Sequence, residues 1–128
     1  MARTVLAVDD NKTYLETFQR LFTFKGYTII TALNPNNALD TIKKAGGLID
    51  LLLTDLDMPE LSGDRLIEEA HRVAPDTKYI LHTARTEDIV QPILKRLKAG
   101  GVDVVYLHKP AGLNDMVSVV ESLIGTAT

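Results

Sequence analysis

The sequence predicts a three-layer α/β sandwich, with five helices packed on a five-stranded parallel sheet of order 2-1-3-4-5. Two observations lead to this prediction. Five short apolar runs alternate along the chain with longer stretches in which apolar residues recur at the helical period. Three of these runs are almost continuously aliphatic, which is typical of parallel strands covered by helices on both faces.

The predicted strands are short, as expected for a domain of this size. They cover residues 5–8, 27–33, 48–53, 79–81 and 102–107. The first, third and fifth are the nearly continuous ones. In an open parallel sheet of this order, ligands bind beyond the carboxyl ends of the strands, where the winding direction reverses between strands one and three.

The first two helices have clear end signals. Leu15, Phe18 and Phe22 form an apolar stripe on the first helix, and Gly26 follows at a position suited to a left-handed C-cap. Asn34 and Pro35 predict an N-cap and a first-turn proline for the second helix. These signals predict where the first helix ends and where the second begins.

The remaining helices are read from their apolar periodicity. The third should end before Pro75, and the fourth should end at Gly100 and Gly101. Pro92 lies inside the fourth apolar stripe, so that helix either kinks or begins near Gln91; the later start is favoured. The fifth helix is expected to begin with Asn114 as its cap.

The composition indicates one domain. The 128 residues are 45% hydrophobic, and residues 1–125 are expected to form the domain with 126–128 as a tail. Fourteen basic and seventeen acidic residues give a net charge of -3, which argues against direct binding to nucleic acid or to an anionic membrane. The chain has no cysteine and no apolar run long enough to span a bilayer, so a cytoplasmic setting is expected.

Acidic residues follow two of the predicted strands. Asp9 and Asp10 come after the first, and Asp55 comes after the third. Neighbouring carboxylates raise one another's pKa or require a cation, which predicts a divalent metal site. Thr83 and Lys109 end two further strands at the same edge, and the five residues together suit phosphoryl transfer.

In this order, the motifs resemble those of the receiver domains of two-component response regulators, over essentially the whole chain. The resemblance rests on an acidic pair, then an aspartate followed by x-x-Met-Pro and a glycine, then Thr-Ala and Lys-Pro. Here these are Asp9-Asp10, Asp55-Leu56-Asp57-Met58-Pro59 with Gly63, Thr83-Ala84 and Lys109-Pro110. The resemblance implies a flavodoxin-like fold and a signalling role.

The resemblance also implies a role for each acidic residue. Asp55 is expected to accept a phosphoryl group from the phosphohistidine of a sensor histidine kinase or of a phosphotransfer protein. Asp10, Asp55 and the backbone carbonyl of Asp57 are expected to hold Mg²⁺, with Asp9 acting through a bound water. The product, an aspartyl phosphate, should be lost slowly, so the domain is not expected to be a turnover enzyme.

Three more residues receive roles from the resemblance. Lys109 and Thr83 are expected to contact the phosphoryl oxygens, and Tyr106 is expected to act as an aromatic switch. The switch would change the face formed by the fourth helix, fifth strand and fifth helix, where an effector of unknown identity or a second copy of the chain could bind. His71, His82 and His108 share no ligand spacing and are left out of the site.

Two other functions remain open from the sequence. Asp55-Leu56-Asp57 also resembles the Asp-x-Asp motif of haloacid-dehalogenase-like phosphohydrolases, and a degenerate receiver could serve only as a protein-interaction module. Asp57 and Arg85 lie two residues after Asp55 and Thr83, and we expect them to pair across the route by which water would reach the phosphoryl group.

Overall fold

Five strands form one parallel sheet in the computed structural model, which describes residues 2–127. The strands are β1 (Thr4–Val8), β2 (Thr28–Ala32), β3 (Leu51–Thr54), β4 (Lys78–Thr83) and β5 (Val104–His108). Their order is β2-β1-β3-β4-β5, which confirms the predicted topology. β1 and β3 are therefore central neighbours, whereas β2 and β5 form the two edges of the sheet.

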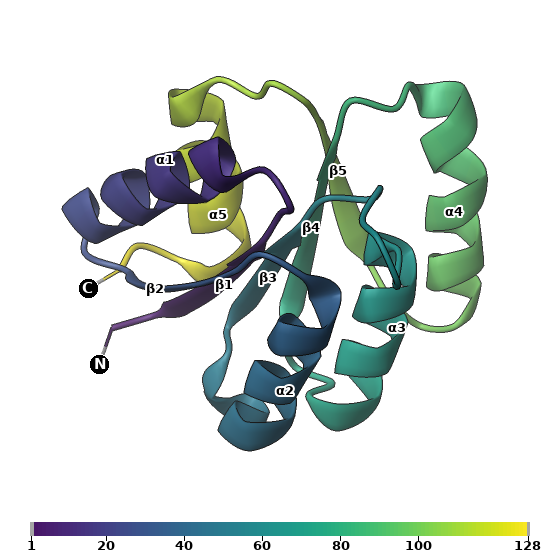
Figure 1. Ribbon diagram of the computed structural model, residues 1–128, viewed down its shortest axis with the longest axis horizontal. Helices are drawn as coiled ribbons and strands as arrows, with labels where there is room; N and C mark the ends of the chain where they lie inside the picture. Colours follow the sequence, from purple (N-terminus) through teal and green to yellow (C-terminus); the bar gives the residue numbers. More distant parts are fainter. Residues whose placement is uncertain (1, 128) are drawn as a thin grey trace.

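Helices cover both faces of the sheet. They are α1 (Lys12–Phe24), α2 (Pro35–Ala45), α3 (Gly63–Val73), α4 (Glu87–Ala99) and α5 (Leu113–Ile124), with a short 3-10 turn, η1, at Gly46–Leu48. α1 and α5 lie on one face, and α2, α3 and α4 lie on the other (Figure 1). The three-layer sandwich predicted from the sequence is confirmed.

Alternation along the central strands divides the core into two parts. Leu6 and Leu52 point to the side of α2, α3 and α4, whereas Ala7 and Leu53 point to the side of α1 and α5. All four are at most 1% exposed, so both faces of β1 and β3 are fully covered. This double burial is the reason that these strands are almost continuously aliphatic in the sequence.

The predicted ends of the first two helices are confirmed. Gly26 has φ +92°, its N–H donates to the Thr23 carbonyl, and the next N–H, of Tyr27, donates to Phe22; these bonds define a Schellman motif. The Asn34 side chain accepts a hydrogen bond of 2.8 Å from the N–H of Asn37 and caps α2.

Two predicted helix starts are wrong. α4 begins at Glu87 rather than near Gln91, and Pro92 lies inside it. An interior proline costs about 3 kcal/mol, but burial of Val90 and Leu97 on one face of the same helix offsets this cost. α5 begins at Leu113 with Gly112 as its cap, so Asn114 is its second residue rather than its cap.

The register of the sheet aligns the carboxyl ends of the strands. Val8 pairs with Thr54, and the N–H of Asp55 extends this ladder by donating to the Val8 carbonyl at 3.0 Å. At the other side, the N–H of Lys109 donates to the Thr83 carbonyl at 2.8 Å. Backbone bonds thus tie the residue after β3 to the end of β1, and the residue after β5 to the end of β4.

The segment after α5 returns to the start of β2. The Tyr27 hydroxyl donates to the Gly125 carbonyl at 2.7 Å, and Ala127, which is 3% exposed, packs in the core beneath α1. Residues 126 and 127 of the expected tail therefore lie against the domain, while Thr128 is outside the described residues. Among the helices of residues 2–127, none combines the length and apolarity needed to cross a bilayer.

Candidate functional site

Three carboxylates converge at the carboxyl edge of the sheet. One side-chain oxygen each from Asp9, Asp10 and Asp55 lies within 4.8 Å of the other two. Asp9 and Asp55 are buried and Asp10 is exposed, so the cluster opens to solvent on the Asp10 side. The N–H of Asn11 donates to Asp9 and the N–H of Leu56 donates to Asp55, which fixes the two buried carboxylates.

Lys109 supplies the opposing positive charge. Its Nζ is 2.8 Å from Asp9 and 3.4 Å from Asp55, and its side chain is 11% exposed. One ammonium against three carboxylates leaves two negative charges unbalanced. Oxygen ligands in this number and an excess of two charges fit a divalent cation such as Mg²⁺.

Burial and charge act together on the titrating groups of the site. Burial raises the pKa of Asp55; the Lys109 ammonium opposes this effect and Asp9 adds to it, and the net direction is upward. Burial alone would lower the pKa of Lys109, but the hydrogen bond and charge of Asp9 outweigh it, so that pKa is raised. Lys109 is therefore a cation at neutral pH.

Thr83 is the last residue of β4, the strand beside β3. It is 1% exposed, and its hydroxyl accepts a hydrogen bond of 3.1 Å from the N–H of Arg85. The Arg85 guanidinium in turn forms two bonds to the Asp57 carboxylate, of 2.9 and 3.1 Å. The predicted Asp57–Arg85 pair is confirmed, and both of its side chains are more than half exposed at the mouth of the site.

Tyr106 lies outside the carboxylate cluster. It is partly exposed on β5, and its hydroxyl donates to the backbone carbonyl of Arg85. The same residue, Arg85, thus contacts the Thr83 hydroxyl through its N–H and the Tyr106 hydroxyl through its carbonyl. The predicted switch residue is linked to the predicted phosphoryl-binding threonine by a single intervening residue.

Gly63 packs directly behind Asp55. A Cβ atom built on Gly63 would lie 2.0 Å from the Asp55 carbonyl oxygen, and the Gly63 N–H donates to the Leu56 carbonyl at 2.8 Å. Gly63 is not among the residues with positive φ, so its backbone conformation does not itself require a glycine. The glycine is needed because the start of α3 contacts the backbone of Asp55, and no side chain fits between them.

Tyr14, which sequence reasoning missed, lies beside the site and contacts His82, which was left out of it. The Lys109 ammonium lies 4.2 Å from the centre of the Tyr14 ring, and the buried His82 ring meets Tyr14 edge-on at 5.6 Å. Burial lowers the pKa of His82 to about 4, with a further contribution from Lys109, so this histidine is neutral. Tyr14 precedes Phe18 of the apolar stripe by one helical turn, and that spacing was the available signal.

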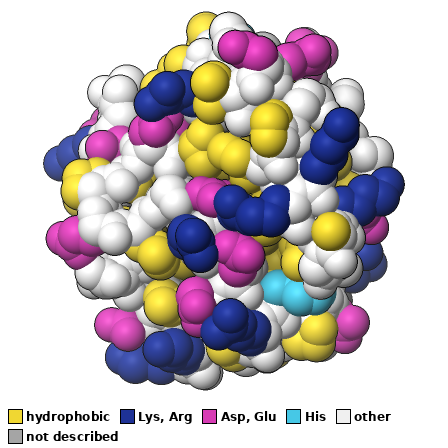
Figure 2. All heavy atoms as spheres, turned by 90° about the vertical axis from the view of Figure 1, so that its right-hand side faces the viewer, with side chains coloured by type: hydrophobic (Ala, Val, Ile, Leu, Met, Phe, Trp, Pro, Cys, Tyr) yellow, Lys and Arg dark blue, Asp and Glu magenta, His cyan; other side chains and the backbone are white. Residues whose placement is uncertain are grey.

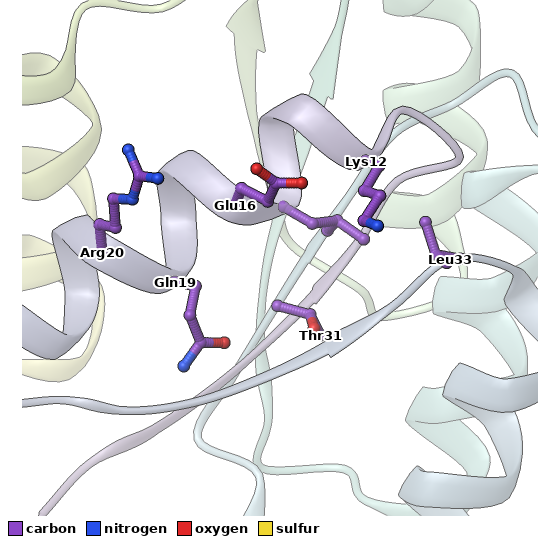
Figure 3. A pocket seen from close by; sticks show the side chains of 7 residues that line it. Lys12, Glu16, Gln19, Arg20, Thr31 and Leu33 are labelled. Atoms are coloured by element: carbon purple, nitrogen blue, oxygen red, sulfur yellow. The ribbon is translucent and has the colours of Figure 1, made fainter.

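The surface also has a groove that is separate from the carboxylates. A groove of about 290 Å³ runs between α1 and the edge strand β2. Its labelled side chains in Figure 3 include Lys12, Glu16 and Arg20, which follow one another at turns of α1, and Leu33 beyond β2. The lining contains neither Asp9, Asp10 nor Asp55, so this groove is separate from the acidic site.

Comparison with known proteins identifies the family. The sequence profile of the response regulator receiver domain matches residues 5–121, and the chain belongs to this family of two-component signalling domains. The response regulator MprA of Mycolicibacterium vanbaalenii is 31% identical over 124 residues, 97% of this chain and 51% of that protein. The sensor kinase CckA of Brucella abortus is 29% identical over 121 residues, 94% of this chain and 12% of that protein.

Solved structures agree with the fold. A CheY-like receiver domain protein from Methanospirillum hungatei superposes with a TM-score of 0.84 at 24% identity, covering 95% of this chain and 93% of that one. A response regulator from Burkholderia pseudomallei, solved with a phosphorylated aspartic acid, calcium ion and citrate, has a TM-score of 0.78 at 25% identity. That match covers 94% of this chain and 66% of the Burkholderia chain.

Proposed function

We propose that this chain is a phosphoacceptor domain in which Asp55 receives a phosphoryl group from the phosphohistidine of a sensor histidine kinase or a phosphotransfer protein. The observation that carries the proposal is the convergence of Asp9, Asp10 and Asp55, with Lys109 Nζ 3.4 Å from Asp55. Membership of the receiver family and the phosphorylated aspartic acid in the Burkholderia regulator support it.

The transfer needs little besides positioning. An Asp55 oxygen forms a bond to phosphorus as the donor's N–P bond breaks, and the electron pair of that bond returns to the donor imidazole. The Leu56 N–H fixes one oxygen of Asp55 at 2.8 Å, which leaves the other, near Lys109, to react. The Lys109 ammonium then faces the new phosphoryl oxygens, and the Thr83 hydroxyl donates to them.

The carboxylates suit a bound Mg²⁺. Asp10, Asp55 and the backbone carbonyl of Asp57 would hold the ion, and Asp9 would act through a bound water. When bound, the ion supplies positive charge that offsets the repulsion between the carboxylate and an anionic donor. The two negative charges that Lys109 leaves unbalanced in the cluster support this assignment.

Phosphorylation is proposed to act on the output face through Arg85. When the Thr83 hydroxyl turns to the phosphoryl group, the N–H of Arg85 loses its acceptor, and the backbone that holds the Tyr106 hydroxyl is free to move. α4 itself is tied to α3 by a bond of 2.6 Å between Arg96 and Asp64. The movement therefore centres on the loop between β4 and α4 and on Tyr106.

The output surface comprises α4, β5 and α5. A groove of about 420 Å³ lies there, with Leu94, Val104 and Leu123 among its apolar residues and Lys98 and Asp103 at its charged margin. The view that faces α4 shows basic and acidic side chains interspersed with hydrophobic ones (Figure 2). A protein effector or a second copy of the chain, rather than nucleic acid, fits this mixed surface.

The proposed domain covers residues 1–125, with Ala127 of the expected tail packed in its core. The chain spans 51% of MprA and 12% of CckA, and those larger proteins contain further regions. The activity of any larger protein that uses this domain would then depend on what the output surface contacts. We assign only the phosphoacceptor step to the residues described above.

Intact mass tests the proposal. The protein is incubated with Mg²⁺ and acetyl phosphate, with and without chelator, and wild type is compared with Asp55→Asn. Asp40→Asn is a matched control, because Asp40 is an exposed aspartate on α2 outside the cluster. We expect one labile phosphoryl group on the wild type and on Asp40→Asn, and none on Asp55→Asn or in the presence of chelator.

The same experiment separates the alternatives. Rapid release of phosphate over many turnovers would indicate a phosphohydrolase, although Asp57, which would be its acid/base residue, is bound to Arg85 at the mouth of the site. Absence of any adduct on folded protein would indicate an interaction module without phosphorylation. Either result would overturn the proposal.

A further inference from the structure

Tyr14 forms one wall of the site next to Lys109. It is the third residue of α1, which Asn11 caps directly after the Asp9-Asp10 pair, and its side chain is partly exposed. The Lys109 ammonium lies 4.2 Å from the centre of the Tyr14 ring, within the range of a cation–π interaction. The lysine therefore has three partners: two carboxylates and one aromatic ring.

Other rings hold Tyr14 in this position. His82 meets it edge-on, with ring centres 5.6 Å apart and planes at 83°, and Phe18 lies 6.2 Å away. Both neighbours are at most 4% exposed and belong to packed elements, β4 and α1. The side of Tyr14 that faces Lys109 is thus fixed by the core rather than by the lysine.

The ring differs from the other two partners of Lys109 in one respect. A cation bound by the carboxylates would offset the charge on Asp9 and Asp55, and this would weaken their ion pairs with Lys109 at 2.8 and 3.4 Å. The attraction of an ammonium to an aromatic face does not depend on those charges. Lys109 has four flexible side-chain bonds, and without the ring only the carboxylates would restrain it.

We propose that Tyr14 is a positioning residue that holds the Lys109 ammonium in the site independently of the charge on Asp9 and Asp55. The proposal rests on the proposed function, since it concerns the cation that faces the phosphoryl group. Tyr14 acts through Lys109 and does not touch the reacting atoms. Its aromatic face is required and its hydroxyl is not.

The first test measures position without any reaction. NMR relaxation of the protein without metal or phosphodonor reports the order parameter of the Lys109 ε-methylene group, which falls when the side chain is less restrained. We expect the wild-type value in Tyr14→Phe, and a lower value in Tyr14→Leu and Tyr14→Met. Phe24→Leu is the control, because Phe24 is an exposed aromatic at the other end of α1 with Lys25 at 5.9 Å.

The second test measures the rate of phosphorylation by acetyl phosphate with saturating Mg²⁺. A cation–π contact of this kind corresponds to about a three- to tenfold change in rate constant. We expect Tyr14→Leu and Tyr14→Met to be slower by that factor, and Tyr14→Phe and Phe24→Leu to stay within about twofold of wild type. Rescue by phenylalanine would not follow if the tyrosine hydroxyl were the active group.

Two results would overturn the proposal. One is a Lys109 order parameter and a phosphorylation rate in Tyr14→Leu that equal those of wild type; the other is an equal loss in Tyr14→Phe and Tyr14→Leu. Failure of the proposed function gives a different pattern, because wild type would then take no phosphoryl group while the NMR comparison still shows whether the ring positions Lys109. Tyr14→Met keeps the test valid if the leucine variant does not fold.

Discussion

Substitution of Gly63 by alanine adds only one methyl group, but it should destabilise the domain because there is no space for that group. The added Cβ would lie 2.0 Å from the Asp55 carbonyl oxygen, 2.9 Å from the carbonyl carbon and 3.1 Å from the Leu56 Cα. Contacts between such atoms are normally about 3.5 Å, so the backbones must separate by roughly 1 Å or more. All three atoms belong to main chain, which cannot rotate out of the way.

The free-energy cost follows from what this separation disturbs. Overpacking in a core typically costs about 1–3 kcal/mol, and here the hydrogen bond from Gly63 N–H to the Leu56 carbonyl is strained as well. Alanine also reduces the conformational entropy of the unfolded chain, which stabilises the folded state by about 0.4–1 kcal/mol and partly offsets this cost. We expect a net loss of about 1–4 kcal/mol in the free energy of unfolding.

Urea unfolding followed by circular dichroism measures this loss. Gly47→Ala is the matched control, because a Cβ there meets no atom within 4 Å and its φ is not positive. That variant should stay within about 0.5 kcal/mol of wild type. If Gly63→Ala were also within about 0.5 kcal/mol of wild type, the close contact between α3 and the Asp55 backbone would be refuted.

Three further predictions concern single side chains. Pro92→Ala should raise the free energy of unfolding by about 1–2 kcal/mol in urea titrations, because alanine supplies a backbone N–H at position 92 that can donate to the Asp88 carbonyl inside α4. Arg85→Ala should lose its phosphoryl group faster than wild type in a mass time course, since the pair with Asp57 no longer obstructs water; slower loss would contradict this. Protonation of His82 should lower the free energy of unfolding by at most about 3 kcal/mol as pH drops from about 6.5 to 4, because His82 binds its proton at a higher pH in the unfolded chain than in the folded one. His82→Leu should remove this part of the pH dependence.

Local sequence patterns were sufficient for the alternation of strands and helices and for the polar residues at the strand ends. The residues that follow β1, β3 and β5 meet because, in this strand order, a parallel register places the strand ends at one edge. The Asp57–Arg85 pair was also predictable, since each residue lies two positions beyond a strand-end residue of the site. In both cases the distance of each residue from the end of its own strand determines which side chains meet.

Other features depend on packing that no local pattern contains. The predicted start of α4 was wrong because the energetic cost of an interior proline can be read from the local sequence, whereas the burial of Val90 and Leu97 that offsets it depends on tertiary packing. The contact of Tyr14 with Lys109 joins α1 to the end of β5, elements separated by most of the chain. The steric role of Gly63 likewise required the position of the Asp55 backbone.

Arg85 contacts the rest of the site through two different parts of the residue. Its guanidinium binds Asp57, whereas its backbone N–H and carbonyl bind the Thr83 and Tyr106 hydroxyls. A side-chain substitution removes the first interaction and leaves both backbone bonds in place. If Asp55 is the phosphoacceptor, as proposed, we expect substitutions of residue 85 to change the lifetime of the phosphoryl group without altering the proposed link between phosphorylation and Tyr106, because that link needs only a peptide backbone at that position.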